Sequence, residues 1–503
     1  MSIDAAARGT RFLEGLGRVT IGGFGRSGRA AAALLSRHGV GYSVIDARPR
    51  ADLAPALDAL PGPPPFTLES AAAALLAGTD TLILSPGIDP RRTPWAEARA
   101  AGVTVLAELE LGWRLATAPV IAISGTNGKS TATALTAALL QGAGRDARAG
   151  GNLGTPLCDL IESPRPDTVF VVEVSSFQLE ATHAFAPEVA VLLNITPDHQ
   201  DRYATFPEYV AAKERLFESQ TPGQWAIVVV DDPQGAEVAA RLARRAARGR
   251  GPRLIAVGAS ADDFWASLPP GEGGRSGSGL DARSSGAPDL ATFQEGELLV
   301  RVDGVAYRFG SAAALPIPGP HNLLNVLAAL AAAFTAGAAA ERLAAPLAAF
   351  PGLPHRLETV GMARGMRWVN DSKATNVDSV LVALRSYEPG RLVVLLGGKD
   401  KGADLAPLAT ELRARARCVV TFGLAGPRFA AALREPLAGA VDLRTASDLA
   451  GAVRLAAAAA RPGDVVLLSP ACASFDAYAN FEERGAHFRA LVEGLSRETA
   501  HGA

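Results

Sequence analysis

The sequence predicts an α/β protein of three domains, each built on a mainly parallel sheet with flanking helices. Short β-branched runs alternate with Ala- and Leu-rich helical segments along the chain, as in parallel sheets covered by helices. The length of 503 residues exceeds what one hydrophobic core normally serves. New sets of strand and helix units begin at about Val19, Val120 and Leu353. The predicted domains cover residues 1–117, 118–350 and 351–503.

One segment, from about 258 to 295, departs from this pattern. It contains the run GEGGRSGSGLDARSSGAP and has no hydrophobic periodicity. We predict a mobile surface loop there and assign it no chemistry.

Charge and composition exclude several classes of function. The 49 basic and 51 acidic residues give a net charge of −2, so no basic excess is present to bind nucleic acid or an anionic membrane. The three cysteines are far apart, without a C-x-x-C pair, and indicate neither a disulfide framework nor a zinc site. The N-terminal residues lack the apolar region of a signal peptide, and the longest apolar stretch is too short to span a membrane. We expect a cytoplasmic monomer that binds neither nucleic acid nor membrane.

The first predicted domain contains a glycine turn. A strand at residues 19–21 leads into Gly23-Phe24-Gly25-Arg26-Ser27-Gly28, and the next strand ends at Asp46. Glycines there let the backbone approach a diphosphate, and the N–H groups at the helix start attract its charge. The motif predicts a nucleotide diphosphate without separating NAD from other nucleotides, and a plain tight turn is the structural alternative.

A second turn, at the start of the second domain, has the features of a phosphate loop. The strand at residues 120–123 runs into Ser124-Gly125-Thr126-Asn127-Gly128-Lys129-Ser130-Thr131, and a helix follows. The Lys129 ammonium would balance triphosphate charge, and the Ser130 hydroxyl would hold Mg²⁺. The loop departs from the usual G-x-x-x-x-G-K-[ST] pattern, because Ile123 stands where the first glycine is expected.

Two further strands of this domain end at polar residues. Glu173 follows the apolar strand at 168–172, and Asn194, Thr196, Asp198, His199 and Asp201 follow the strand at 189–193. The carboxyl ends of parallel strands share one edge of a sheet, which is where such sheets bind ligands. Glu173 and His199 are therefore candidate metal or substrate ligands, and a surface histidine is an equal alternative for His199.

Lys213 stands among Tyr209, Val210, Leu216 and Phe217 on the apolar face of a predicted helix. An unpaired buried ammonium is unfavourable, so this lysine either extends to the surface or meets an anion or metal site. The residues alone do not decide between these alternatives.

The third predicted domain repeats the strand-end arrangement. Its strands at residues 366–369, 391–396 and 465–468 each end at a polar motif. These motifs are Asn370-Asp371-Ser372-Lys373, Gly397-Gly398-Lys399 and Ser469-Pro470. We expect them to form one binding edge.

Several motifs, taken in order, resemble those of the ATP-dependent Mur ligases of peptidoglycan synthesis. They are GTNGKST, GNLGTPL, VEVSSFQLE, NITPDHQDRY, YVAAKERLF, PGPHNLLN, LPHRLE, NDSKATN, LLGGKDKGADL and LLSPACASFDAYANFEERG. The closing motif favours the member that adds D-glutamate over the one that adds L-alanine. The resemblance implies that D-glutamate is joined to UDP-N-acetylmuramoyl-L-alanine through an acyl phosphate, with ATP and Mg²⁺.

The resemblance also implies roles for individual residues. It makes the glycine turn a site for the UDP-sugar, with Ser27, Gly28, Asp46, Arg48, Gly87 and Asn152. It assigns ATP to Gly125, Thr126, Asn127, Gly128, Lys129, Ser130, Thr131, His321, Asn322, Asn325, Arg356, Asp371 and Lys373. Catalytic roles fall on Lys129, Glu173, His199 and Lys213, and the metal ligands are Ser130, Glu173, His199 and Lys213 as a CO₂-derived carbamate. It assigns D-glutamate binding to Thr375, Lys401, Ser474 and Phe481, and by spacing Lys399 is an alternative to Lys401.

Three other functions remain open at this point. A neighbouring Mur ligase could add L-alanine or L-glutamate, an NAD-dependent oxidoreductase would use only the glycine turn, and a nucleotide-dependent switch would use only the phosphate loop. For Ser474 and Phe481 a helix cap and a core aromatic are the structural alternatives.

Overall fold

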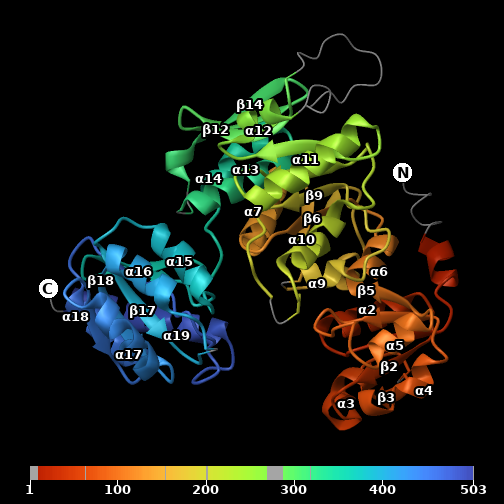
Figure 1. Cartoon of the computed structure of the whole chain (residues 1–503), viewed down its shortest axis with the longest axis horizontal. Coiled ribbons are helices and arrows are strands. Elements are labelled where there is room, and N and C mark those ends of the chain that lie inside the picture. The colour runs from red at the N-terminus through yellow and green to blue at the C-terminus, as the bar shows by residue number, and fades with distance from the viewer. Residues whose placement is uncertain are drawn as a thin grey trace. The chain divides into compact units, whose positions relative to one another are not determined.

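The computed structural model contains three mainly parallel sheets with flanking helices (Figure 1), and the predicted fold class is confirmed. The structure describes residues 9–62, 64–152, 154–199, 202–268, 287–315, 317, 319–400 and 402–501. The chain divides into two compact units, Met1–Ala314 with Leu324–Ala349 and Leu315–Leu323 with Phe350–Ala503. The first unit holds two of the sheets, and the second unit holds the third. The exact domain limits of 117 and 350 stay a prediction.

The first sheet has the strand order β3-β2-β1-β4-β5, and all its strands are parallel. Its strands are β1 (Val19–Gly22), β2 (Tyr42–Asp46), β3 (Phe66–Leu68), β4 (Thr81–Leu84) and β5 (Thr104–Ala107). The accompanying helices are α2 (Arg26–Arg37), α3 (Arg50–Asp58), η1 (Glu69–Ala71), α4 (Ala73–Leu76), α5 (Trp95–Ala100) and α6 (Glu108–Leu115). The neighbours Val44 and Ile45 belong to two different core clusters, because successive strand residues point to opposite faces. The strand order reverses between β1 and β4, which is where such sheets bind ligands.

The second sheet has the order β14-β13-β12-β11-β10-β9-β6-β8-β7. The strands are β6 (Val120–Ser124), β7 (Asp146–Gly151), β8 (Thr168–Glu173), β9 (Val189–Leu192), β10 (Trp225–Val229), β11 (Arg253–Val257), β12 (Leu290–Gln294), β13 (Glu297–Val302) and β14 (Val305–Ser311). Its helices are α7 (Lys129–Gly142), α8 (Leu157–Leu160), α9 (Ser176–Leu179), α10 (Phe206–Glu214), η2 (Arg215–Phe217), α11 (Pro233–Ala247), α12 (Ala261–Ser267), η3 (Ala312–Ala314), α13 (Pro320–Thr335), η4 (Ala340–Arg342) and α14 (Ala344–Ala349). β12, β13 and β14 pair antiparallel, and the remaining pairs are parallel. β6 lies between β8 and β9, so their carboxyl ends meet beside the phosphate loop.

The prediction of one loop over residues 258–295 is wrong at both ends of the segment. Helix α12 buries Phe264 and Trp265. Strand β12 pairs with β11 through Leu290 and Ala291. These short elements are stabilised by burial against the sheet, which no periodicity in so short a run can indicate. Residues 269–286 lie outside the described residues.

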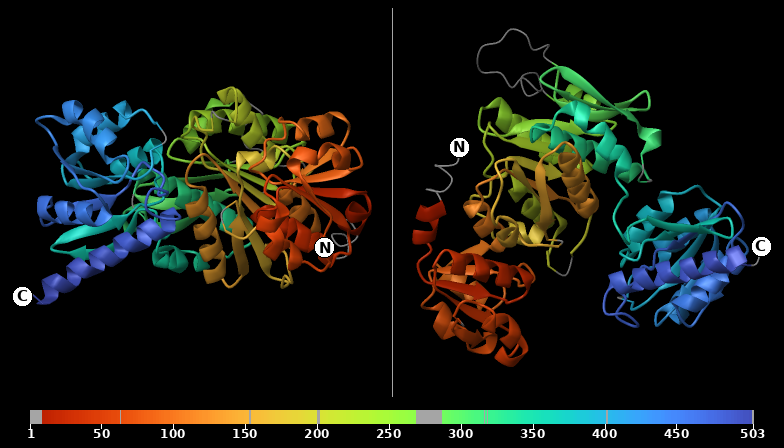
Figure 2. Two further views of the ribbon diagram at one scale, coloured as in Figure 1. Left: turned by 90° about the horizontal axis from the view of Figure 1, so that it is seen from below. Right: turned by 180° about the vertical axis from the view of Figure 1, so that it is seen from behind.

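The third sheet has the order β15-β16-β20-β17-β18-β19, with only β15 antiparallel to its neighbour. Its strands are β15 (Glu358–Ala363), β16 (Met366–Asn370), β17 (Leu392–Gly397), β18 (Ala416–Phe422), β19 (Asp442–Thr445) and β20 (Val465–Leu468). Its helices are α15 (Val377–Arg385), α16 (Ala406–Arg415), α17 (Gly426–Leu437), α18 (Leu449–Ala459) and α19 (Phe481–His501). The long α19 packs against β15 and α18 (Figure 2). Among the described residues, no helix is both long and apolar enough to cross a membrane.

Candidate active site

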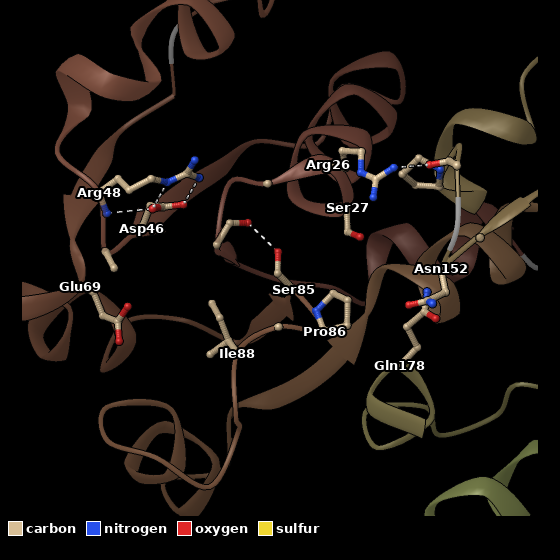
Figure 3. Close-up of a pocket in the computed structure, with 17 residues that line it drawn as sticks. Arg26, Ser27, Asp46, Arg48, Glu69, Ser85, Pro86, Ile88, Asn152 and Gln178 are labelled. Atoms are coloured by element: carbon tan, nitrogen blue, oxygen red, sulfur yellow. Dashed lines mark hydrogen bonds and ion pairs between the residues drawn. The ribbon is translucent and has the colours of Figure 1, made fainter. Parts of the chain in front are cut away.

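A cavity of about 450 Å³ opens at the carboxyl ends of β1 and β4 (Figure 3). We call it the first-sheet cavity. It is lined by Gly23, Gly25, Arg26, Ser27, Asp46, Ala47, Arg48, Glu69, Ser85, Pro86, Gly87, Ile88, Gly151, Asn152, Gly154, Pro156 and Gln178. One side is closed by residues of the second sheet and the segments that follow its strands, namely Gly151, Asn152, Gly154, Pro156 and Gln178. There Arg26 Nη1 donates to the carbonyl of Gly154 at 3.2 Å. The lining includes five of the six residues predicted for the UDP-sugar: Ser27, Asp46, Arg48, Gly87 and Asn152.

Gly28, the sixth of these residues, does not line the cavity but packs against the glycine turn. A Cβ on Gly28 would lie 2.0 Å from the carbonyl oxygen of Gly23, so only glycine lets α2 pack so closely on the turn. Gly23 itself has φ +83°, which favours glycine. The two glycines shape the turn that the N-terminus of α2 faces.

Asp46 is already paired within the cavity. Its carboxylate accepts two hydrogen bonds of 2.9 Å from the Arg48 guanidinium and one of 2.6 Å from the backbone N–H of Phe24. Burial raises the pKa of Asp46, but the hydrogen bonds from Arg48 and Phe24 outweigh it and lower the pKa to about 2. The pair fixes the glycine turn to β2 and leaves the Arg48 side chain half exposed at the cavity.

The phosphate loop is held by the strand end beside it. Asn194 Oδ1 accepts from the backbone N–H of Asn127 at 2.8 Å, and its Nδ2 donates to the Asn127 carbonyl at 3.1 Å. The Thr126 hydroxyl lies 3.1 Å from that of Tyr209. Gly128 has φ +84°, and a Cβ there would lie 2.4 Å from Asn325 Oδ1, so the turn requires glycine. The end of β9, α10 and α13 thus contribute to one loop conformation.

Two lysines meet at this loop. Lys129 Nζ donates to the carbonyls of Gly125 and Thr126, each at 2.8 Å, and Lys213 Nζ donates to Gly125 at the same distance. Lys213 is 1% exposed and its ammonium lies 4.8 Å from the centre of the Tyr209 ring. Burial and the nearby Lys129 lower the pKa of Lys213 well below its ordinary value, against the opposing charges of Asp198 and Glu173. The lysine is therefore buried rather than extended to the surface.

Glu173 lies at the end of β8 and is 4% exposed. Asn152 Nδ2 donates to its Oε1 at 3.0 Å. Its Oε2 is buried and has no hydrogen-bond partner in the described part of the chain, and the hydroxyls of Ser124 and Thr131 share that state. A buried carboxylate oxygen without a donor calls for a cation or a protonated ligand.

His199 lies on the loop after β9, in the left-handed region at φ 53°. The centre of its ring lies 4.7 Å from that of Phe177, and its Nε2 is 3.7 Å from Asp198 Oδ2. The side chain is exposed. Among the described residues, no three His, Cys, Asp or Glu side chains form a group that could hold a metal, so a metal here needs other ligands as well.

The three residues predicted for ATP on α13 lie in its first two turns. Asn322 and Asn325 are buried. Burial and the nearby Arg356 lower the pKa of His321 to about 4, so its imidazole is neutral at physiological pH.

Asp371 and Arg356 face each other at one edge of the third sheet. The Ser469 hydroxyl donates to Asp371 Oδ2 at 2.8 Å. Burial raises the pKa of Asp371 to about 7, although Ser469 and Arg356 act in the opposite direction. Arg356 Nε is buried without a hydrogen-bond partner in the described part of the chain. This corner has polar groups that a bound ligand can satisfy.

The residues predicted for D-glutamate follow nearby strands. The Lys373 ammonium lies 5.7 Å from the centre of the Phe481 ring, and the Thr375 N–H donates to the Lys373 carbonyl at 2.9 Å. Ser474 is buried, and its carbonyl accepts from the N–H of Tyr478 at 3.0 Å. Lys401 lies outside the described residues, and its alternative Lys399 is exposed. The choice between these two lysines therefore stays open.

Arg484 is a residue that the sequence analysis did not single out. It is 0% exposed, and its guanidinium donates to Ser372 Oγ at 2.9 Å and to the carbonyls of Ser372 and Cys472 at 2.8 and 3.1 Å. Burial lowers the pKa of Arg484 to about 10, although Asp476 acts to raise it. The side chain ties two strand-end motifs together. The FEERG run in the closing motif was the available signal.

Three protein-family models match the chain. They are the Mur ligase MurD-like N-terminal domain over residues 17–107, the Mur ligase middle domain over 123–333, and the Mur ligase glutamate ligase domain over 355–472. A UDP-N-acetylmuramoylalanine–D-glutamate ligase of Geobacter metallireducens is 40% identical over 479 residues, covering 95% of this chain and 97% of the relative. The ligase of the same name from Anaeromyxobacter dehalogenans is 42% identical over 491 residues, covering 95% and 98%. The chain belongs to the Mur ligase family.

A solved structure agrees with this Mur ligase fold. The pseudomurein peptide ligase type C from Methanothermus fervidus aligns with 95% of this chain and 100% of its own at a TM-score of 0.53, with 17% sequence identity. Like other Mur ligases, the protein uses ATP as a co-substrate.

Proposed function

We propose that this Mur ligase joins the L-alanine carboxylate of UDP-N-acetylmuramoyl-L-alanine to the amino group of D-glutamate, with conversion of ATP to ADP and phosphate. The observation that carries the proposal is the identity of 40–42% with ligases named for this reaction, over 95% of the chain. The proposal includes a place for the enzyme in the cytoplasmic steps of peptidoglycan precursor synthesis, and we expect a monomer.

Each substrate has a proposed place. The UDP-sugar occupies the first-sheet cavity, whose mixed polar and apolar lining suits a nucleotide. The ATP phosphates bind the loop from Gly125 to Thr131, and the residues of α13 with Arg356, Asp371 and Lys373 complete the nucleotide site. D-Glutamate binds at Thr375, Lys401, Ser474 and Phe481.

The reaction has two steps. A carboxylate is a poor electrophile because its leaving group would be oxide. An oxygen of the L-alanine carboxylate therefore first attacks the γ-phosphorus, the bond to ADP breaks, and an acyl phosphate forms. The D-glutamate nitrogen then attacks the carbonyl carbon, phosphate leaves, and the nitrogen loses a proton. Lys129 offsets the charge that develops on the transferred phosphoryl group.

The proposal includes a magnesium site, and the fit rests on Glu173. Its buried Oε2 has no hydrogen-bond partner in the described part of the chain, and a hard oxygen of this kind is the ligand that Mg²⁺ prefers. Ser130, His199 and Lys213 as a carbamate would complete the ligand set. The ion supplies charge neutralisation for the phosphates when it is bound.

Lys213 is proposed to act as a carbamate. An ammonium beside Mg²⁺ would repel the ion, whereas a carbamate presents anionic oxygens. The lowered pKa of Lys213 favours the neutral amine that captures CO₂. We expect Lys213→Ala to lose activity and a small carboxylate at high concentration to restore part of it. Lys213→Arg keeps the charge and should not recover, and full activity of Lys213→Arg would refute the carbamate.

The function is tested by phosphate release from ATP with UDP-N-acetylmuramoyl-L-alanine, screened against D- and L-amino acids. We expect release that depends on both the UDP-sugar and D-glutamate. Selective release with L-alanine or L-glutamate would assign a different member of the family. Release without an amino acid would indicate a nucleotide-dependent switch, and binding of NADH would support an oxidoreductase.

A further inference from the structure

Arg202 lies three residues beyond His199, and only 8% of its side chain is exposed. Its Nη2 donates to Glu180 Oε2 at 2.7 Å and to the backbone carbonyl of Ile88 at 3.3 Å. Its Nε lies 4.0 Å from Asp89 Oδ1. Ile88 lines the first-sheet cavity, whereas Arg202 belongs to the second sheet's loop, so one guanidinium joins the two.

Each of the two loops, the one from Ile88 to Arg91 and the one that carries Arg202, donates a hydrogen bond to the other. Arg91 pairs with Asp89 at 2.9 Å and also donates to the backbone carbonyl of Arg202. The loop from Ile88 to Arg91 therefore holds Arg202 by its side chain and by its backbone. This arrangement fixes the position of Arg202.

The same guanidinium reaches His199 through an aromatic ring. The Phe177 ring has the Arg202 guanidinium carbon 4.7 Å from its centre and the centre of the His199 ring at the same distance. A cation over an aromatic face is attracted to it, so Arg202 fixes the ring against which His199 packs.

The network continues to the phosphate loop. The rings of Tyr203 and Tyr209 lie 5.3 Å apart, and the Tyr209 hydroxyl contacts that of Thr126 at 3.1 Å. Thr126 Oγ1 also accepts from the backbone N–H of Thr196 at 3.0 Å. A continuous set of contacts thus connects Ile88 in the first-sheet cavity with Thr126 in the phosphate loop.

We propose that Arg202 is a positioning residue that couples occupancy of the first-sheet cavity to binding at the phosphate loop, so that the UDP-sugar and ATP strengthen each other's binding. The inference rests on the proposed function, because it takes the UDP-sugar and ATP as the two ligands. A ligand against Ile88 orders the loop that holds Arg202, and Arg202 orders the Phe177 ring against which His199 packs. By linkage, each ligand then raises the affinity of the other by the same factor.

Calorimetry on the full chain tests this coupling. The affinity for UDP-N-acetylmuramoyl-L-alanine is measured with and without a saturating non-hydrolysable ATP analogue and Mg²⁺, in the absence of D-glutamate. We expect the wild type to bind the UDP-sugar about fivefold or more tightly with the analogue present, within the usual range of coupling factors. Arg202→Met should bring the ratio of affinities to about one. Arg202→Lys should lose most of the coupling, since an ammonium lacks the planar fork of donors.

Arg241→Met is the matched control. Arg241 also pairs with a glutamate, Glu214, at 2.7 and 3.0 Å, but it lies on α11 outside this network. It should keep the wild-type ratio. If Arg202→Met does not fold, Asp89→Asn and Arg91→Met are tested in its place. A ratio of affinities that is unchanged from the wild type in both variants overturns the proposal.

Three other outcomes can be told apart. A wild-type ratio of about one, with both ligands bound, overturns the coupling and leaves the proposed function standing. A chain that binds neither ligand overturns the proposed function itself. A ratio retained in Arg202→Met overturns the role of Arg202.

Discussion

The first-sheet cavity and the phosphate loop, for which we propose the UDP-sugar and ATP as ligands, have differently arranged charges. In the cavity, the buried Asp46 is paired with Arg48 by two hydrogen bonds of 2.9 Å. At the phosphate loop, Lys129 and Lys213 share the carbonyl of Gly125, and Glu173 Oε2 is buried without a hydrogen-bond partner in the described part of the chain. One site is electrostatically complete before ligands bind, and the other is not.

This difference separates binding from chemistry. Groups that pair with each other stabilise the fold and shape the cavity proposed for the UDP-sugar. Two lysines crowded near one carbonyl oppose folding, but Lys129 provides the positive charge proposed to meet the triphosphate, and Lys213 provides the amine proposed to bind CO₂. We therefore expect substitutions in the two regions to change stability in opposite directions.

The largest effect is expected for Lys129→Ala, which breaks the charge arrangement of the phosphate loop. The described part of the loop has no other cationic side chain, so phosphate release should fall by about 10³-fold or more. Circular dichroism should show a folded protein. Arg434→Ala, on the exposed face of α17, is the control and should keep full activity. Turnover within tenfold of the wild type would remove Lys129 from the mechanism.

Lys213→Met tests most directly whether the lysines at the phosphate loop oppose folding. It replaces a buried amine by an apolar side chain of similar length, so activity should fall by about 10²-fold or more. The melting temperature should rise by about 2 °C or more, because the desolvation of Lys213 is removed. Thermal unfolding followed by calorimetry measures the change. A lower melting temperature in the variant would contradict the claim that this site opposes folding.

Asp46→Asn should have the reverse effect on stability. It removes a charge-assisted pair in the cavity, which contributes about 1.5 to 3 kcal/mol. The melting temperature should fall, and the KM for the UDP-sugar should rise about tenfold with a smaller change in kcat. Asp80→Asn is matched to it, because Asp80 pairs with Arg18 at 3.2 Å in the same sheet but both side chains are exposed. Equal losses in the two variants would show that burial of the Asp46 pair is unimportant.

The smallest effect concerns Glu108, a buried carboxyl that, unlike Asp46, forms no ion pair within the described part of the chain. Burial raises the pKa of Glu108 to about 7, although hydrogen bonds from Cys158 act in the opposite direction. Between pH 4.5 and 7 the unfolded chain loses this proton and the folded chain keeps it, so this group lowers stability as pH rises.

Glu108→Gln should remove that fall, which is at most about 1.4 kcal/mol per pH unit. Denaturant unfolding at several pH values, compared between variant and wild type, measures the difference. Glu110→Gln is the control, because Glu110 is paired with Arg114 at 2.8 Å. Parallel pH profiles of wild type and Glu108→Gln would contradict the raised pKa.

The strand alternation predicted the fold class because buried parallel strands leave a strong local pattern. The same pattern placed Glu173 at a strand end, where the structure has it. The pairing of Asp46 with Arg48 was not predicted, although the two are only two residues apart, because both were assigned to the UDP-sugar. The segment 258–295 was misread because its elements are stabilised by the sheet beside them.

Arg202 and Arg484 were missed for another reason. Arg202 is buried by residues 88–89, 177 and 180, and Arg484 by residues 372 and 472. Each lies on a polar stretch that periodicity describes as exposed. Their partners are distant in the sequence, so only the folded chain reveals the contacts.

In the proposed reaction, the L-alanine carboxylate attacks ATP first, and the D-glutamate amine attacks the resulting acyl phosphate. This order is tested with UDP-N-acetylmuramoyl-L-alanine carrying ¹⁸O at both oxygens of that carboxylate, D-glutamate and ATP, by mass spectrometry of the released phosphate. We expect each phosphate to carry one ¹⁸O, because the carboxylate oxygen that attacks phosphorus leaves with it. Phosphate without ¹⁸O, released together with the amide product, would contradict the acyl phosphate.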